Sequence, residues 1–315
     1  MKLLKTLKKK WSQKTSSPLP EENGVTYLHH KPSRGNIGDL LCSPRHYFLF
    51  QRPIKGLHIV GGGVFVGLAV EKLKRNKIPG DRAVLWGAGQ SLVDPEHTSA
   101  TVTELPYLDW GIRDKASVQD EHHFVPCCSC LHGMLDQPAQ SQQTLLFLNA
   151  DPKITAASSL ETCRELAEKN GWVLLFNNCS EVAFEKALHA SEHIITNSYH
   201  GSYWGLLAGR KVTMLGYSSK FIHLLTNVGL PTDHMVRIPR GDGPSLLQQL
   251  ATIDQAPVLL LTQAKNILNQ FRERNLSFAN RLTDQGIVAG YTLKARVTEQ
   301  FSDWRYPTDQ GRMEA

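Results

Sequence analysis

The sequence has no long apolar segment. Among its 315 residues, no apolar run approaches the roughly 20 residues that a membrane-spanning helix needs. Residues 1–11 also lack the apolar core and the small-residue cleavage site of a secretory signal. The six cysteines follow no repeated spacing, so a disulfide scaffold is not indicated. We therefore expect a cytoplasmic protein with free thiols in a reducing compartment.

Excess positive charge is scarce outside the first residues. The formal net charge is +6, and Met1–Lys14 holds six lysines and no acidic residue, so the rest of the chain is close to neutral. We therefore expect no nucleic-acid partner. Leu3, Leu4, Leu7 and Trp11 lie at helical spacing among these lysines. Such a segment either contacts an anionic membrane surface, which would make the protein peripheral on the inner face of the membrane, or is a solvated terminus.

A complete nucleotide-binding fingerprint is also missing. Gly61-x-Gly63 is followed by Gly67, which departs from the dinucleotide spacing G-x-G-x-x-G by one residue. Gly62 and Gly67 have the separation of a phosphate-binding loop, but Leu68 stands where a lysine is required. What remains is a strand end at which the backbone closely approaches a ligand or a neighbouring helix.

A zinc-binding framework is missing as well. Cysteines 127, 128 and 130 with His132 form a dense group, but no second cysteine or histidine pair completes a structural zinc site. Adjacent thiols also point in opposite directions on a strand. We expect a buried strand end or loop here, and no metal in the protein.

Two series of alternating strands and helices are present, and they predict an α/β protein with two Rossmann-like domains facing a cleft. A Gln/Ser/Pro-rich stretch, Asp136–Gln143, separates the series. The predicted strands are 25–29, 57–60, 83–86, 110–113, 144–149, 172–176, 194–196 and 212–215. Helices are predicted near Leu40 and at 68–76, 159–170, 180–189, 202–208, 221–228, 245–250 and 258–281. A further helix is predicted to start near Lys115, with Asp114 as its N-cap. The predicted divisions are an N-terminal segment with linker at 1–20, domains at 21–140 and 141–290, and a polar tail at 291–315.

The segment Ile194–Gly216 is the most informative of these units. It reads as a strand, a turn, a helix and a second strand, which favours a parallel sheet. His200 falls in the turn at the carboxyl end of the first strand. Open α/β sheets bind ligands at that edge, and a helix N-terminus there offers N–H groups to an anion. His200 is therefore the leading catalytic candidate.

Polar residues follow other predicted strands. Asp39 comes after the first strand, where it is either a helix cap or a group that holds or deprotonates a sugar hydroxyl. Lys220 follows the strand that ends near Leu215, so it can reach the crevice of His200. A lysine at a helix start opposes the helix dipole, which points to an anion nearby. Arg113 is a second anion contact or pairs with Asp114.

The sequence resembles the polysaccharide pyruvyl transferase family in six motifs that follow one another in the family's order over residues 25–230. They are Asn36-Ile-Gly-Asp39, Gly61–Gly63, Gly87-Ala-Gly89-Gln90, Arg113-Asp114, Asn197-Ser-Tyr-His200-Gly201 and Tyr217-Ser-Ser-Lys220. The resemblance implies the two-domain glycosyltransferase-B fold, with 21–140 on the acceptor side and 141–290 on the donor side. It also implies transfer of the enolpyruvyl unit of phosphoenolpyruvate to sugar hydroxyls as a cyclic ketal, with release of phosphate.

The reaction that the resemblance implies suggests roles for residues at the matching positions. We hypothesise that His200 is the acid/base group and that Asp39 orients or deprotonates the acceptor hydroxyl. No cofactor or metal is required if lysine and backbone dipoles carry the charge. The acceptor would be a bacterial-type surface polysaccharide or its lipid-linked oligosaccharide precursor. The donor-binding residues would be Asn197, Ser198, Gly201, Lys220 and Arg113, and the acceptor-binding residues Asn36, Gly62 and Gly63.

One departure and two alternatives accompany this resemblance. The family often has an arginine two positions before the histidine, where this sequence has Ser198. Lys220, Arg113, Arg210 or Lys211 would have to supply that charge. The alternatives are a nucleotide-sugar glycosyltransferase of the same fold and a non-catalytic glycan-binding protein of a polysaccharide assembly complex.

Overall fold

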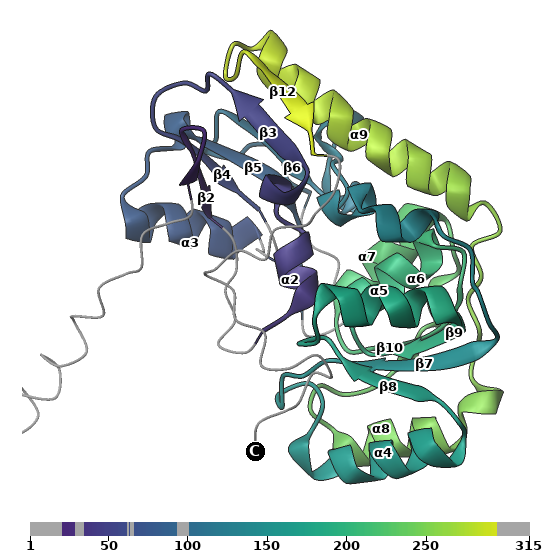
Figure 1. The fold of residues 1–315 in the computed structure, drawn as a ribbon. Coiled ribbons are helices and arrows are strands. Elements are labelled where there is room, and N and C mark those ends of the chain that lie inside the picture. Colours follow the sequence, from purple (N-terminus) through teal and green to yellow (C-terminus); the bar gives the residue numbers. More distant parts are fainter. Residues whose placement is uncertain (1–20, 29–34, 62, 64–65, 93–100, 295–315) are drawn as a thin grey trace, which may run out of the picture.

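A computed structural model describes residues 21–28, 35–61, 63, 66–92 and 101–294. It shows a mixed α/β protein with two five-stranded sheets and one two-stranded sheet (Figure 1). The expected α/β class with parallel strands is therefore confirmed. The predicted basic segment 1–14, Gly62 and most of the predicted tail lie outside the described residues. Within the described ranges, no helix combines the length and the apolar character needed to cross a membrane.

The first sheet has the order β1-β2-β4-β5-β6, in which only β1 is antiparallel to its neighbour. Val84 and Trp86 point to one core, and Leu85 points to the other, as alternation along a strand requires. Helix α3 (Val66–Asn76) joins β4 to β5 and packs Ala69 against the second of these cores. The strands are β1 (Glu21–Glu22), β2 (Val25–Leu28), β4 (Leu57–Val60), β5 (Ala83–Ala88) and β6 (Asp109–Ile112).

The second sheet is parallel throughout and has the order β11-β10-β9-β7-β8. Its first strand in the chain, β7, lies between its second and third strands. In such doubly wound sheets the crevice at this change of direction is where ligands bind. The strands are β7 (Gln143–Leu148), β8 (Val173–Phe176), β9 (Ser191–Thr196), β10 (Lys211–Gly216) and β11 (Val236–Arg237).

Helices cover both faces of the second sheet, which explains its continuous apolar strands (Figure 1). Leu145 and Phe147 of β7 face helices α5 (Glu181–Ala190), α6 (Tyr199–Leu207) and α7 (Ser219–Val228). Leu146 and Leu148 face α4 (Leu160–Lys169) and α8 (Gly243–Ala251).

Three predicted helices differ from the structure. Helix α6 begins at Tyr199 rather than at residue 202, so His200 lies in its first turn and not in the turn before it. The helix predicted for 258–281 is α9 (Ala264–Asp284), because Leu259 forms two backbone hydrogen bonds with Val212. After Asp114 there is only a 3₁₀ turn at 115–117, and the Asp114 side chain does not cap it.

The two larger sheets meet around the short helix α2 (Ile37–Leu41), which packs in the core of the second sheet. The backbone N–H of Ile37 donates to the carbonyl of Asn177, which follows β8, over 2.7 Å. Ile37 belongs to the same apolar cluster as Trp204 of α6. The indole of Trp204 donates to Ser129 over 2.9 Å. These contacts join residues from both halves of the chain.

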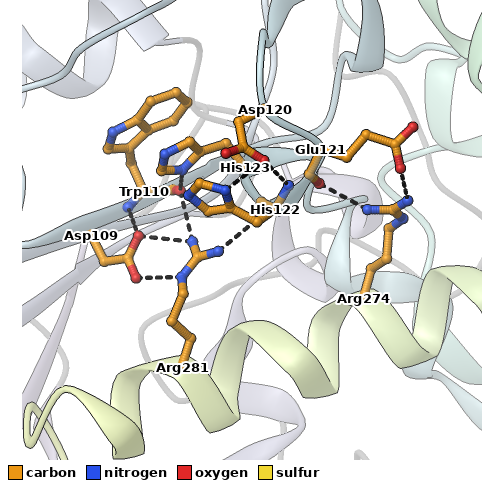
Figure 2. A network of polar contacts seen from close by, with 8 residues as sticks. All are labelled: Asp109, Trp110, Asp120, Glu121, His122, His123, Arg274 and Arg281. Carbon is orange, nitrogen blue, oxygen red and sulfur yellow. Dashed lines mark hydrogen bonds and ion pairs between the residues drawn. The ribbon is translucent and has the colours of Figure 1, made fainter.

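Helix α9 spans both cores, as its course in Figure 1 shows. Its first half buries Phe271 in the cluster of the second sheet, and its second half buries Phe278 in that of the first. Figure 2 shows two arginines that fasten it, since Arg274 pairs with Glu121 and Arg281 binds both oxygens of the buried Asp109. Beyond it, β12 (Gly290–Leu293) pairs with β3 (Phe48–Gln51), two strands that the sequence did not predict.

Asn275 is a fully buried polar residue in the middle of α9. Its Oδ1 accepts from the indole of Trp86 over 2.8 Å, and its Nδ2 donates to the carbonyls of Phe271 and Pro126 over 3.0 and 3.2 Å. These bonds join the helix to β5 and to the loop before residue 127.

Replacing Asn275 with alanine should lower the free energy of unfolding by about 2 kcal/mol, because the Trp86 N–H and the Pro126 carbonyl lose their buried partner. Urea unfolding measures the change. Asn269→Ala is the matched control, since Asn269 lies on the exposed face of the same helix. Equal stability of the two variants would contradict the prediction.

Candidate functional site

A small pocket lies where the two large sheets meet, and both contribute to it. Its cavity volume is about 50 Å³, far below the roughly 300–1,000 Å³ of pockets that enclose a drug-sized ligand. From the side of the first sheet it is lined by Asn36, Asp39, Gly63 and Arg113. From the second it is lined by Asn149, Asn177, Ser198, Tyr199, His200 and Lys220. The structure thus brings together seven residues that the sequence selected.

Asp39 is in the first turn of α2, but it does not cap this helix. Asn36 is the N-cap, since its Oδ1 accepts from the N–H of Gly38 over 3.0 Å, and its Nδ2 donates to Asp39 Oδ2 over 3.0 Å. Burial raises the pKa of Asp39 to about 7, although Lys220 and Arg113 act in the opposite direction. This carboxyl group therefore titrates close to neutral pH.

His200 is 6% exposed and reaches the pocket from the first turn of α6. Burial is the main cause that lowers its pKa below the usual value, and Arg113 and Lys220 add to the effect, while the Cys127 thiol opposes it. The imidazole is therefore neutral at pH 7. Its Nε2 lies 3.6 Å from Cys127 Sγ.

Arg113 is a buried cation without a counter-ion in the described chain. Its guanidinium lies 4.2 Å from the centre of the Tyr199 ring, and its buried Nε has no hydrogen-bond partner among the described residues. Asp114, the predicted alternative partner, forms no direct ion pair with Arg113 among the described residues. Burial acts to lower the pKa of Arg113, but Tyr199 and then the charge of Asp114 raise it. The carboxylate of Asp114 instead accepts from the backbone N–H of Gln90 and lies 3.4 Å from His223.

Lys220 adds a second cation, from the first turn of α7. Its Nζ donates to the Tyr217 hydroxyl over 2.7 Å and has no carboxylate partner in the described ranges. Burial lowers the pKa of Lys220 to about 7, repulsion from Arg113 contributes, and Asp39 opposes the shift. A guanidinium and an amine that titrates near neutral pH thus face one carboxyl group that titrates in the same range. The arrangement can bind a small anion.

Three glycines leave room for three of these side chains. A Cβ atom at Gly38 would overlap the imidazole of His200, and one at Gly63 would overlap the carboxylate of Asp39. A Cβ at Gly89 would overlap the guanidinium of Arg113. The close approach that the sequence indicated in this glycine turn is, at Gly63, an approach to Asp39.

Asn197 and Gly201 do not line the pocket. Asn197 Oδ1 accepts from the N–H of Asn149 over 2.7 Å, and its Nδ2 donates to Thr155 over 2.9 Å, so the amide ties together the loops beyond β7 and β9. Gly201 packs against Phe147, which leaves no space for a side chain.

Arg210 and Lys211, the other two cationic candidates from the sequence, do not line the pocket. Lys211 is exposed and pairs with Glu192 over 2.7 Å. Arg210 donates to three backbone carbonyls, those of Gln137, Leu188 and Ala208. Arg113 and Lys220 are therefore the two of these four cations that line the pocket.

Three residues that line the pocket, and one that contacts His200, were not predicted from the sequence. Asn149 and Asn177 directly follow β7 and β8, so the signal that selected Ser198 was present for them too. Tyr199 gave no such signal. Cys127, which contacts His200, was expected only as part of a buried strand end or loop.

A larger hollow, with a cavity volume of about 500 Å³, lies over α9. Two of its lining residues, Arg274 and Arg281, already pair with Glu121 and Asp109 (Figure 2). Their charges are neutralised, so this hollow does not share the electrostatic character of the small pocket.

Comparisons with known proteins return little. No protein-family model matches the chain, and no curated protein does. A solved structure described as "Crystal Structure Analysis of the Glycotransferase of kitacinnamycin" aligns with 74% of this chain and 70% of its own, at 14% identity and a TM-score of 0.41. We rest no conclusion on this likeness.

Anion binding should weaken as the pH rises. Lys220 and Asp39 both lose a proton near pH 7. The first change removes a positive charge from the pocket, and the second adds a negative charge. Sulfate, which stays a dianion, should bind about tenfold more weakly at a pH of about 8.5 than at about 6, equivalent to about 1.4 kcal/mol. Isothermal titration measures this. A pH dependence that persists in full in the double variant of Lys220→Met and Asp39→Asn would contradict the assignment.

Proposed function

We propose that the protein is a pyruvyl transferase, which moves the enolpyruvyl unit of phosphoenolpyruvate to two hydroxyl groups of a sugar and releases phosphate. The observation that carries the proposal is the pair of cations, Arg113 and Lys220, which face one small pocket without a carboxylate partner in the described chain. Phosphoenolpyruvate has a phosphate and a carboxylate, so it offers each cation an anionic group.

Arg113 is our candidate for the arginine that the family often has at the position of Ser198. It arrives from the end of β6, in the other half of the chain, and its guanidinium covers the ring of Tyr199, the residue next to Ser198. Ser198 in turn is free to serve as the N-cap of α6. The same charge would thus be supplied from a different part of the chain.

The reaction joins one phosphoenolpyruvate to two hydroxyl groups of one sugar. In the first step, one hydroxyl oxygen attacks the central carbon of the enol, the methylene carbon takes up a proton, and the hydroxyl proton passes to a base. In the second step, the other hydroxyl displaces phosphate from the same carbon, which closes the ketal and releases a proton. The site must therefore supply a proton donor, a base and groups that hold the leaving phosphate.

Two side chains suit the proton transfers. Asp39 has a pKa of about 7, so it can donate a proton to the methylene carbon at neutral pH. His200 is neutral there and can accept the hydroxyl proton. These assignments exchange the roles that we expected from the sequence. Burial raises the pKa of Asp39 to about 7 and lowers that of His200, so the carboxyl group is the better proton donor and the imidazole the base.

The pocket size favours a small donor over a nucleotide sugar. A cavity of about 50 Å³ accommodates part of a small anion, and the sugar acceptor would extend outward past Gly63 and Asp39. A glycosyltransferase-B arrangement, with the first sheet on the acceptor side and the second on the donor side, is part of the proposal. The domain boundaries at residues 140 and 290 belong to it too.

Arg113→Gln and Lys220→Gln should each raise the phosphoenolpyruvate concentration for half-maximal rate at least about tenfold, because each loses a charge-assisted contact. His200→Ala and Asp39→Asn should instead lower the maximal rate. Phosphate release and the mass gain of candidate sugar acceptors measure both effects.

Lys211→Gln is the control, because this exposed lysine already pairs with Glu192. Full turnover by both His200→Ala and Asp39→Asn would contradict the proposed roles. Thermal stabilisation by a uridine or cytidine diphosphate sugar, with no effect of phosphoenolpyruvate, would favour a glycosyltransferase. Glycan binding without phosphate release would favour a binding protein.

A lipid-linked acceptor and a peripheral position on the inner face of the membrane are further parts of the proposal, and they rest on the six lysines of residues 1–14. Deleting Met1–Lys14 should abolish binding to vesicles that contain anionic lipid and leave the circular dichroism spectrum unchanged. Vesicles of neutral lipid are the control. Undiminished binding by the truncated chain would rule out this role.

A further inference from the structure

Two thiols and one imidazole converge behind the pocket from three separate parts of the chain. Cys42 follows α2, Cys127 precedes the 3₁₀ turn at 128–131, and His200 is in the first turn of α6. Their Sγ and ring nitrogen atoms lie within 4.8 Å of one another. All three residues are buried, with exposed fractions of 4%, 2% and 6%.

We propose that Cys42, Cys127 and His200 form a binding site for one thiophilic divalent cation, with Zn²⁺ as the probe. This inference does not rest on the proposed transfer reaction. It concerns the three ligand atoms and would hold for a protein with another activity.

The distances suit a tetrahedral ion. With Zn–S bonds of about 2.3 Å and Zn–N bonds of about 2.05 Å, a sulfur and a nitrogen ligand stand about 3.6 Å apart, and two sulfur ligands about 3.8 Å. The separation of Cys127 Sγ from His200 Nε2 is 3.6 Å. Since all three atoms lie within 4.8 Å of one another, shifts of about 1 Å or less would complete the geometry.

The ligand atoms have only weak competing partners. Cys42 Sγ donates to the carbonyl of Asp39 over 3.4 Å, and Cys127 Sγ lies 3.2 Å from the Ser129 hydroxyl. Among the described residues, the Cys127 thiol is the one hydrogen-bonding group that reaches Nε2 of His200. A metal ion would therefore displace no strong hydrogen bond.

Charge also balances in the bound state. Binding converts both thiols to thiolates, two protons leave to solvent, and the two negative charges neutralise the ion. Two cysteines and one histidine leave one tetrahedral position for water or a ligand oxygen, the pattern of catalytic rather than structural zinc sites. The bound ion would hold Nε2 of His200, so we expect it to inhibit any reaction in which that nitrogen carries a proton.

The test uses the full chain, reduced and freed of metal with a chelator. Titration with Co²⁺ should give visible absorption of a tetrahedral ion and a thiolate-to-cobalt band in the near ultraviolet, saturating at one equivalent. Zn²⁺ should abolish both signals. A reduced wild-type chain that shows neither signal would overturn the proposal, whatever the variants do.

Single variants then locate the ion. Cys42→Ser and Cys127→Ser should each weaken Zn²⁺ binding roughly hundredfold or more in chelator competition, since even outer-shell changes cost about 10- to 100-fold. Cys163→Ser is the matched control, because Cys163 is buried in another core, on α4. Unchanged affinity in both Cys42→Ser and Cys127→Ser would place the ion elsewhere and overturn the assignment.

Discussion

The burial of positive charge without a counter-ion is the constraint around which the site is arranged. A guanidinium removed from water loses much of its hydration, and an isolated buried charge is costly unless other groups compensate. For Arg113 the compensation within the described chain comes from the face of Tyr199, a contact that is worth about 2 kcal/mol or more when desolvated, and from the charge of Asp114. Burial in the same pocket lowers the pKa of Lys220 and raises that of Asp39, so both side chains are shifted toward their uncharged forms. An incoming anion completes this arrangement.

The site depends on the contact between the two sheets, which we call the seam, because each half of the chain contributes only some of the lining residues. Asp39 and Arg113 come from the first sheet, and His200 and Lys220 from the second. The seam is held by specific polar contacts, among them the bond of Tyr203 to the carbonyl of Cys127 over 2.9 Å. A change that shifts one sheet against the other would separate the proton-transfer groups and the cations without altering any of them.

Much of this could be predicted from the sequence, for a topological reason. The carboxyl ends of parallel strands meet at one edge, so polar residues directly after apolar strands were placed in one pocket. The direction of each side chain could not be predicted, because it depends on the local turn. Ser198 lines the pocket, whereas its neighbour Asn197 turns to the backbone of Asn149. The pairing of β3 with β12 was missed because it joins distant segments.

The cluster of Cys42, Cys127 and His200 was missed for the same reason. Rules for metal sites rely on short spacings such as C-x₂-C, and these rules rejected the dense cysteine group near His132. In the structure His132 instead bonds Glu181 over 3.0 Å, and Cys127 meets partners far away in the chain. The packing of α2 against both α6 and the 3₁₀ turn at 128–131 creates the cluster.

The return of the chain through α9 has a mechanical consequence. Residues 136–143, all exposed, lead from the first sheet to the second, and α9 leads back to β12 beside β3. The two halves are therefore tethered twice. A cut in the exposed connection at 136–143 would therefore leave the halves attached through α9, which packs against both apolar clusters.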